Sequence, residues 1–285
     1  MDMNLVLQGP KASQDTLARI AALAQPSAHT VAVGAHALRC EQVELSDALR
    51  STIELAAAMR KHVDATFIAP GRTLADFRLV AMDMDSTLIT IECIDEIADM
   101  QGLKAQVSEI TEAAMRGELD FSASLTRRVA LLKGLDASAL ERVYTERLRI
   151  SLGGEAMLAG IKAIGLKTLL VSGGFTFFTE RLKQRLGLDY THANELEIAD
   201  GKLTGRVVGG IVDAEEKMRT VQRVCAEMGI ETSQAIVMGD GANDLKMMGI
   251  ASSLSLAFRA KPVVRAQASI ALNYTGLDGL LNILS

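Results

Sequence analysis

The stretch VAMDMDSTLITIECIDEIA, residues 80–98, carries the strongest signal for the fold. It overlaps a short apolar run, Leu79–Met82, which is followed at once by Asp83 and, two residues on, by Asp85. Short apolar runs of this kind are typical of strands buried on both faces of a parallel sheet. Two carboxyl groups at one strand end are unfavourable unless a cation or a proton compensates them. The stretch therefore predicts a buried strand with a reactive or metal-binding carboxyl end.

Two more apolar runs end in polar sequence of a similar kind. Thr168–Val171 leads into Ser172-Gly173-Gly174, and Ala235–Met238 leads into GDGAND at 239–244. Because open α/β sheets bind ligands at the carboxyl ends of their strands, we expect these segments to share one site.

The residue types in these segments suit phosphate and a divalent cation. Ser172 offers a hydroxyl, and the glycines that follow it offer backbone N–H groups, which together can hold a phosphate. Asp240 and Asp244 offer the oxygen ligands that Mg²⁺ prefers. Lys217, at an expected helix start, would supply a point positive charge to an oxyanion.

Each segment also has an ordinary explanation when taken alone. Asp-x-Asp commonly caps a turn, and Gly-Asp-Gly or Ser-Gly-Gly can be a plain loop. Lys217 stands among Glu215, Glu216 and Arg219, which is typical of a solvated helix face. The order of the four segments, with strands before three of them, favours a common site over coincidence.

The rest of the chain predicts an α/β protein in two parts. Residues 78–285 alternate strand-like and helical sequence, as in a doubly wound parallel sheet, with a helical cap inserted after the first core strand at about 92–152. Residues 202–213 resemble a hairpin or strand pair, and 252–257 and 270–272 are further strand candidates. Residues 1–72 read as a small α/β module, with a helix at 48–61, that closes at Pro70-Gly71.

Composition excludes several classes of function. With 49% apolar residues the chain can bury a large core, and a net charge of −5 argues against nucleic acid as a partner. No apolar stretch is long enough for a membrane helix, and the N-terminus does not read as a secretory signal. The three cysteines fit neither a disulfide framework nor a zinc site, so we expect a reducing, cytoplasmic setting. None of the cysteines begins a Cys-x5-Arg motif, and no P-loop is present.

The motifs match those of the haloacid dehalogenase superfamily in combination. These are DMDST at 83–87, Ser172, Lys217 and GDGAND at 239–244. More narrowly, residues 80–98, VSGGF at 171–175 and GDGANDLKMM at 239–248 resemble the phosphoserine phosphatases. The resemblance covers about 78–285 and implies a Rossmann-like core. Similar enzymes often carry an ACT-like regulatory module, which residues 1–72 would represent.

The resemblance also implies a mechanism and a site. Asp83 would be the nucleophile that becomes phosphorylated, and Asp85 the general acid and base. Mg²⁺ would be held by Asp83, the Asp85 carbonyl, Asp240 and, through water, Asp244. The phosphate would be bound by Ser172, Gly173, Lys217 and Asn243.

The cap residues implied by the resemblance would choose the substrate. Glu92 would meet an ammonium group, Arg128 a carboxylate, and Met115 and Phe121 would form the apolar wall. Singly, these residues also fit a helix N-terminus, a solvated helix face and ordinary core. Together they imply hydrolysis of O-phospho-L-serine, the last step of serine biosynthesis in this family.

Two alternatives stay open at this point. Glu92 and Arg128 suit any amino-acid phosphate, including phosphohomoserine, so they do not fix the chain length of the substrate. Residues 1–72 could bind an amino-acid effector, pair two copies into a homodimer, or be purely structural.

Overall fold

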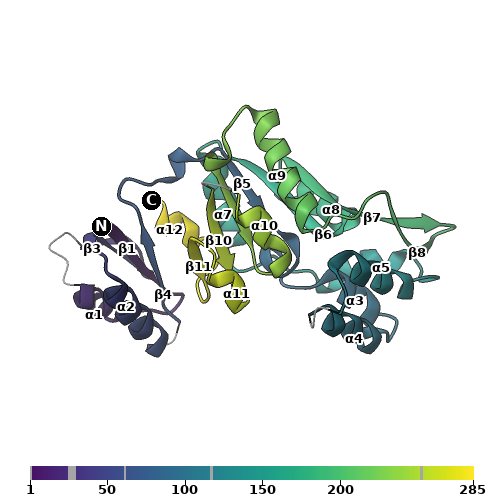
Figure 1. Cartoon of the computed structure of the whole chain (residues 1–285), viewed down its shortest axis with the longest axis horizontal. Helices are drawn as coiled ribbons and strands as arrows, with labels where there is room; N and C mark the ends of the chain where they lie inside the picture. Colours follow the sequence, from purple (N-terminus) through teal and green to yellow (C-terminus); the bar gives the residue numbers. More distant parts are fainter. Residues whose placement is uncertain (1, 25–29, 61, 116–117, 251–252) are drawn as a thin grey trace.

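Two β-sheets, each with helices of its own, make up the chain (Figure 1). The structure, a computed structural model, describes residues 2–24, 30–60, 62–115, 118–250 and 253–285. No helix among these residues is long and apolar enough to cross a membrane.

The N-terminal sheet is antiparallel, with strand order β2-β3-β1-β4. Its elements follow a complete βαββαβ order: β1 (Asp2–Gln8), α1 (Gln14–Ala21), β2 (Thr30–Gly34), β3 (Ala37–Glu44), α2 (Asp47–Met59) and β4 (Asp64–Ile68). Ser13 and Ser46 cap the two helices, each accepting a hydrogen bond from a first-turn N–H group. Apolar residues of β1 and of both helices form one buried cluster between the sheet and the helices.

The larger sheet has seven strands in the order β11-β10-β9-β5-β6-β7-β8. The strands are β5 (Leu79–Met82), β6 (Lys167–Phe175), β7 (Tyr190–Ala199), β8 (Lys202–Val208), β9 (Ala235–Gly239), β10 (Leu254–Phe258) and β11 (Ile270–Leu272). All pairs are parallel except β7 with β8.

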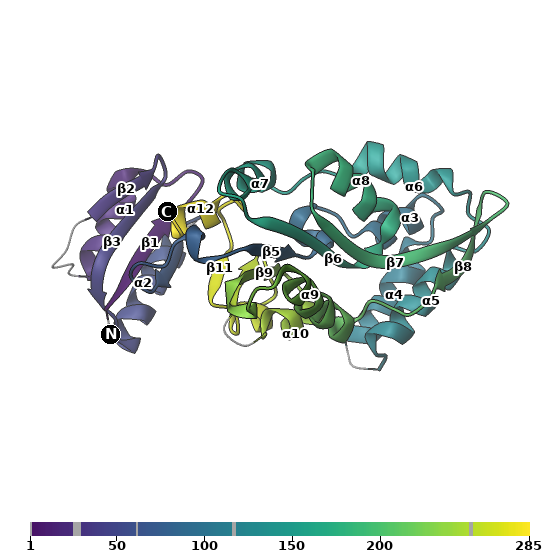
Figure 2. The ribbon, with the colours of Figure 1, turned by 90° about the horizontal axis from the view of Figure 1, so that it is seen from above.

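Helices cover both faces of this sheet, so it is doubly wound as expected (Figure 2). The helices are α7 (Gly154–Ala163), α8 (Thr176–Leu186), α9 (Ala214–Met228), α10 (Leu245–Met248), α11 (Pro262–Arg265) and α12 (Gly279–Ile283). Val80 and Met82 of β5 pack in one apolar cluster with α7, α8 and α12, whereas Leu79 and Ala81 pack in a second with α9, α10 and α11. The alternation of side chains along β5 therefore buries it on both sides.

Four of the helices between β5 and β6 in the sequence form the cap, and α3, α4 and α5 are labelled in Figure 1. The four are α3 (Cys93–Asp99), α4 (Lys104–Met115), α5 (Phe121–Leu131) and α6 (Ser138–Arg142). The two chain segments that join the cap to the core run side by side. Ile89 bridges Ile150, and the Thr90 and Ser151 N–H groups donate to the Arg149 and Leu88 carbonyls.

Buried polar contacts fix the N-terminal sheet to the core. The Asp64 carboxylate accepts from three successive backbone N–H groups, those of Asn273, Tyr274 and Thr275, at 2.8, 3.1 and 2.8 Å. The Gln8 amide donates to the Gly279 carbonyl at 3.2 Å.

Some expectations about elements need correction. Residues 202–213 do not form a strand pair within themselves. Only 202–208 is a strand, and it pairs with β7, which the sequence did not reveal. Gly209 has a φ of +76°, so the chain turns away from the sheet there. Ser172-Gly173-Gly174 lies inside the carboxyl end of β6, not in a turn after it.

Two predicted elements reach beyond the described residues. The predicted helix 48–61 ends at Met59, and Lys61 lies outside the described residues. The predicted strand 252–257 begins at Leu254, and residue 252 lies outside them as well.

Candidate active site

The turn after β5 directs two aspartates toward one cavity. Ser86 has a φ of +56°, and the Leu88 N–H group donates to the Asp83 carbonyl, so the chain reverses within five residues. Asp83 and Asp85 both line the resulting cavity. Thr87 at the end of the same turn donates its hydroxyl to Asp240 Oδ1 at 3.0 Å, which ties this turn to the loop after β9.

Lys217 is a fully buried cation. Its Nζ donates to Asp83 Oδ1 at 2.7 Å and to Asp244 Oδ1 at 2.8 Å. Burial alone would lower the pKa of Lys217, but Asp244 and Asp83 outweigh burial and raise it. The interpretation of Lys217 as one charge on a solvated helix face is therefore wrong.

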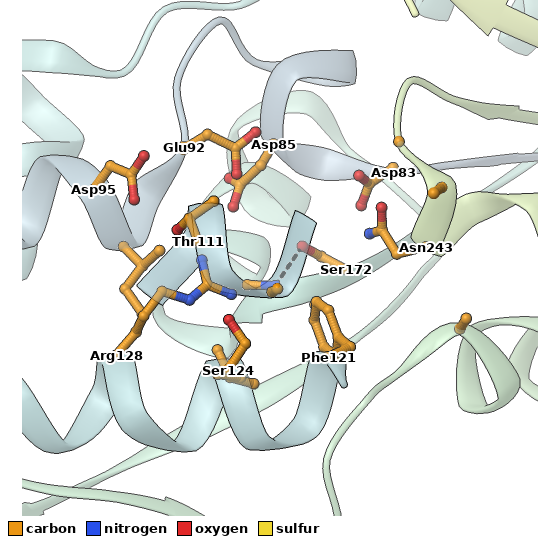
Figure 3. Close-up of a pocket in the computed structure, with 18 of the residues that line it drawn as sticks. Asp83, Asp85, Glu92, Asp95, Thr111, Phe121, Ser124, Arg128, Ser172 and Asn243 are labelled. Atoms are coloured by element: carbon orange, nitrogen blue, oxygen red, sulfur yellow. Dashed lines mark hydrogen bonds between the residues drawn. The ribbon is translucent and has the colours of Figure 1, made fainter. Parts of the chain in front are cut away.

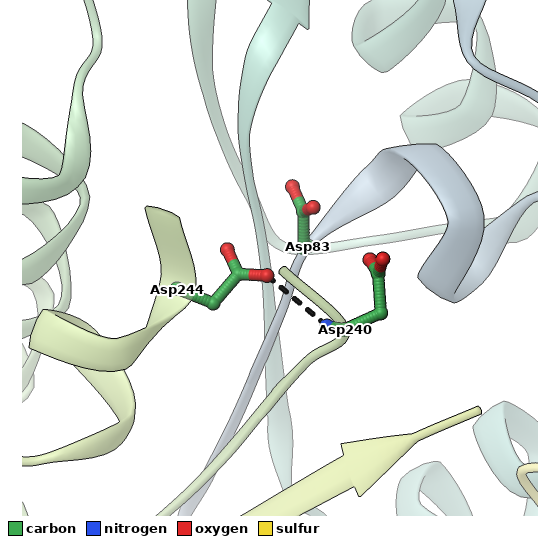
Figure 4. A group of neighbouring side chains, drawn as sticks. All are labelled: Asp83, Asp240 and Asp244. Atoms are coloured by element: carbon green, nitrogen blue, oxygen red, sulfur yellow. Dashed lines mark hydrogen bonds between the residues drawn. The ribbon is translucent and has the colours of Figure 1, made fainter. Parts of the chain in front are cut away.

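Three carboxylates converge beside this lysine (Figure 4). One oxygen each of Asp83, Asp240 and Asp244 lies within 4.8 Å of the others. Burial, then the Asp244 carboxylate, raises the pKa of Asp240 to about 7. Burial also raises the pKa of Asp83, against the effect of Lys217. One lysine does not balance two buried carboxylates and a half-buried one, so the cluster has the charge and the donor type that suit a divalent cation.

Asp244 differs from the other two carboxylates because the protein engages both of its oxygens. Oδ1 accepts from Lys217, and Oδ2 accepts from the Asp240 and Gly241 N–H groups at 3.1 and 3.0 Å. It therefore holds the loop in shape, and Asp83 and Asp240 have the freer oxygens of the cluster.

The end of β6 forms a glycine-lined cradle. Ser172 is buried, and its Oγ accepts from the Gly174 N–H group at 2.8 Å (Figure 3). A Cβ at Gly173 would lie 2.7 Å from Phe121 Cζ, and one at Gly174 would lie 2.7 Å from Met84 Cε. A side chain at either position would push Phe121 or Met84 aside, and the glycines leave the backbone facing the cavity.

Asn194 orients this cradle and was missed in the sequence. It is buried, and its Nδ2 donates to the Gly173 carbonyl at 2.8 Å while its Oδ1 accepts from the Val212 N–H group at 2.8 Å. Asn194 lies on β7, the strand that the sequence did not predict, so its place beside β6 was not apparent.

The cavity has a volume of about 730 Å³ and lies between the strand ends and the cap. Figure 3 shows Glu92, Asp95 and Arg128 at its cap side and Asp83, Ser172 and Asn243 at its core side. The Ser86 hydroxyl donates to Glu92 Oε1 at 2.6 Å. These groups give the cap side of the cavity two acidic side chains, Glu92 and Asp95, and one basic side chain, Arg128.

Burial shifts the pKa of the charged groups around the cavity. It raises the pKa of Asp85 to about 8, assisted by Glu92 and opposed by hydrogen bonds from Cys93. It lowers the pKa of Arg128, against the effect of Asp95 and Glu92. Arg128 Nε is buried without a hydrogen-bond partner among the described residues. The guanidinium is thus a donor that a carboxylate ligand could satisfy.

The structure brings together nearly all the site residues expected from the sequence. The cavity wall includes Asp83, Asp85, Glu92, Phe121, Arg128, Ser172, Gly173, Asp240 and Asn243. Lys217 and Asp244 lie beneath it and contact Asp83 or each other. Met115 ends α4, and its side chain lies outside the described part of the structure. Asp95, Thr111, Ser124 and Lys261 also line the cavity, although the sequence did not single them out.

The fold and the site define a hydrolase of one superfamily. The family model for haloacid dehalogenase-like hydrolases matches residues 80–249, and the chain belongs to this family.

Particular relatives share most of the chain. It is 56% identical over 220 residues to a phosphoserine phosphatase from Polaromonas sp., covering 75% of this chain and 93% of that one. It is 49% identical over 212 residues to the phosphoserine phosphatase of Haemophilus influenzae, covering 74% and 67%.

Two solved structures match both sheets. A HAD family hydrolase from Salmonella enterica serovar Typhi has a TM-score of 0.87 at 33% identity, covering 99% of this chain and 98% of that one. An unliganded probable phosphoserine phosphatase from Vibrio cholerae has a TM-score of 0.84 at 35% identity, covering 99% and 86%.

Proposed function

We propose that this chain is a Mg²⁺-dependent phosphatase that hydrolyses O-phospho-L-serine to L-serine and phosphate. The observation that carries the proposal is one cavity with Asp83 at the core end, Arg128 at the cap end, and Asp85 and Glu92 side by side between them. The core end suits a phosphate. Glu92 offers an anion for an ammonium group, and Arg128 offers a guanidinium for a carboxylate. The names of the relatives support the same substrate.

Asp83 acts as the nucleophile in this proposal. One of its oxygens attacks phosphorus, the bond between phosphorus and the serine oxygen breaks, and an aspartyl-phosphate forms. Asp85, whose pKa of about 8 keeps it largely protonated near neutral pH, gives its proton to the departing serine oxygen. The resulting carboxylate then takes a proton from water as that water attacks phosphorus, which releases phosphate and restores both aspartates.

The phosphoryl oxygens need donors that are already in place. Ser172 and the Gly173 N–H group would supply two, and Asn243 a third. The Lys217 ammonium has three N–H groups, of which Asp83 and Asp244 accept from two. The third can reach an oxygen of a phosphate attached to Asp83.

The carboxylate cluster fits Mg²⁺ by its charge and its oxygen donors. Asp83, Asp240 and the Asp85 carbonyl would hold the ion, with Asp244 acting through water. Bound there, Mg²⁺ neutralises charge so that an anionic carboxylate can approach an anionic phosphate.

A second substrate of the same class suits the cap end as well. Glu92 and Arg128 would also hold a longer amino-acid phosphate such as phosphohomoserine, because both groups recognise only the charged ends. Relative kcat/KM values for the two phosphates separate these candidates.

For residues 1–72 we propose a supporting, ACT-like module. The buried contacts of Asp64 and Gln8 with the core support this role. An amino-acid effector or pairing of two copies could add to it, and serine calorimetry with light scattering on the whole protein tests both.

The proposal is tested by Mg²⁺-dependent release of phosphate from L-phosphoserine. Asp83→Asn should lower kcat by about 1,000-fold or more, because an amide is a poor nucleophile. Asp200→Asn is the matched control, since Asp200 is exposed and is not among the residues that line the cavity. Retained activity in Asp83→Asn would contradict the covalent mechanism.

A further inference from the structure

One face of α5 forms part of the cavity wall. Phe121, Ser124, Leu125 and Arg128 lie on that face, at the spacing of three, four and seven residues that helical geometry brings together. Ser124 and Arg128 are one helical turn apart and both point into the cavity in Figure 3. The mechanism above gives Ser124 no role.

The hydroxyl of Ser124 belongs to the cavity wall and is not used by the protein. The residue is only 2% exposed, it lines the cavity, and its hydroxyl makes no hydrogen bond with the described residues. Two other hydroxyls on the cap helices bond back to their own helix: Thr111 donates to the Val107 carbonyl at 3.0 Å and Thr126 to the Ser122 carbonyl at 2.8 Å. Ser124 makes no such local bond, and its oxygen is not among the fully buried unpaired atoms of the described residues, so it borders the cavity. It is therefore available to a ligand.

The position of Ser124 along α5 indicates which part of a ligand its hydroxyl would contact. Phe121 packs on Gly173, where the phosphate end lies, and Arg128 is at the opposite end. With a helical rise of about 1.5 Å per residue, Ser124 lies about 5 Å from Phe121 and about 6 Å from Arg128 along the axis. Arg128 beside it favours an anionic acceptor, and a carboxylate has lone pairs left after it binds a guanidinium.

We propose that the Ser124 hydroxyl donates a hydrogen bond to the substrate carboxylate that Arg128 binds. This inference rests on the proposed function and deepens it, because it makes the carboxylate site a two-residue site on one helix face. Ser124 is then a substrate-binding residue that selects phosphoserine over phosphates that lack a carboxylate.

Ser124→Ala tests the proposal with two substrates that differ only in the carboxylate. For L-phosphoserine, kcat/KM should fall about ten-fold or more, mainly through KM, because a hydrogen bond to a charged group is lost. For phosphoethanolamine, which has no carboxylate, kcat/KM should change less than about two-fold. Where that turnover is too slow to measure, the inhibition constant of inorganic phosphate serves instead and should be unchanged.

Ser122→Ala is the matched control, because Ser122 is on the same helix but does not line the cavity. This variant should leave kcat/KM unchanged for both substrates, and the two variants should have similar Tm values. The inference is overturned if Ser124→Ala leaves phosphoserine kinetics unchanged, or weakens both substrates equally. If the unaltered protein releases no phosphate from phosphoserine, the proposed function fails and this inference fails with it.

Discussion

Lys217 and its neighbouring carboxylates set the charge of the site. Three buried or half-buried aspartates, Asp83, Asp240 and Asp244, surround one lysine, and Asp85 lies in the same cavity. Without a metal ion, this surplus of negative charge is reduced by protons. The pKa values of Asp85 and Asp240 are accordingly raised to about 8 and about 7, so both carboxyls hold protons to a higher pH than usual.

The first prediction concerns pH and metal. Folding raises the pKa of both carboxyls above their unfolded values near 4, so the folded state binds more protons than the unfolded state. Their stabilisation is complete below about pH 4 and is lost as pH rises through 7 and 8. Mg²⁺ should therefore raise Tm more at pH 8.5 than at pH 5.5, by about 5 °C or more, in thermal unfolding with Mg²⁺ or a chelator.

Asp240→Asn gives this prediction a control. The variant removes one of the two titrating carboxyls and one of the carboxylates proposed to hold Mg²⁺, so the dependence of the Mg²⁺ effect on pH should shrink. A metal-induced rise in Tm of the same size at both pH values would contradict the prediction.

Single residues of the site were partly predictable. The order of the motifs identified Asp83, Asp240 and Ser172, because each follows an apolar run that predicts a buried strand. The burial of Lys217 was harder to foresee, since its neighbours Glu215 and Glu216 are charged. A signal was present, because Lys217 shares one helix face with Thr220, Val221 and Val224, all of which are buried.

At the scale of elements, the shape of the loop after β9 depends on Gly239, because Asp244 packs where a side chain at that position would lie. A Cβ at Gly239 would lie 2.5 Å from the Cβ of Asp244, whose carboxylate holds Lys217 and two loop N–H groups. Gly239→Ala should displace Asp244, lower kcat about 100-fold and weaken Mg²⁺ binding, as measured by phosphate release at varied Mg²⁺.

Gly210→Ala is its control, because nothing lies within 4 Å of a Cβ there and its φ is not in the left-handed region. That variant should keep its Mg²⁺ affinity. Equal effects of the two substitutions would mean that the contact with Asp244 is unimportant.

Strands were predicted correctly where a short apolar run ended in polar residues. The apolar runs before Asp83, Ser172 and Asp240 were confirmed as parallel strands of one sheet. β7 was missed because THANELEI alternates charged, polar and small residues, and only part of it is buried. Pairing with β6 and β8 stabilises β7 as a strand, although its own sequence has no clear strand pattern.

At the scale of the whole molecule, Asp64 joins the two sheets. Asp64→Ala removes the acceptor of three buried N–H groups, so the free energy of unfolding should fall by about 2–5 kcal/mol. Chemical denaturation measures this loss. Phosphatase activity per folded molecule should stay nearly constant, since Asp64 is not part of the cavity wall.

Glu54→Ala provides the comparison. Its carboxylate pairs with Arg50 at 3.9 Å on the surface, and such pairs contribute less than about 1 kcal/mol. If Asp64→Ala destabilised the protein no more than Glu54→Ala does, the three hydrogen bonds would not fix the module to the core.

No local pattern could have predicted this junction. Asp64 and Gln8 meet backbone groups about 200 or more residues away, and their neighbours in sequence read as ordinary strand ends. Periodicity indicates which face of a strand is buried, but it does not identify a distant loop as the partner. The three bonds of Asp64 depend on the assembled fold.

The same junction has a consequence for the order of events during protein synthesis. Residues 2–68 leave the ribosome about 200 residues before 273–279, the segment that contains the hydrogen-bond partners of Asp64 and Gln8. Until that segment emerges, the nascent module keeps those two side chains hydrated. The contacts that bury Asp64 and Gln8 can therefore form only after β9, β10 and β11 have left the ribosome, late in the synthesis of the chain.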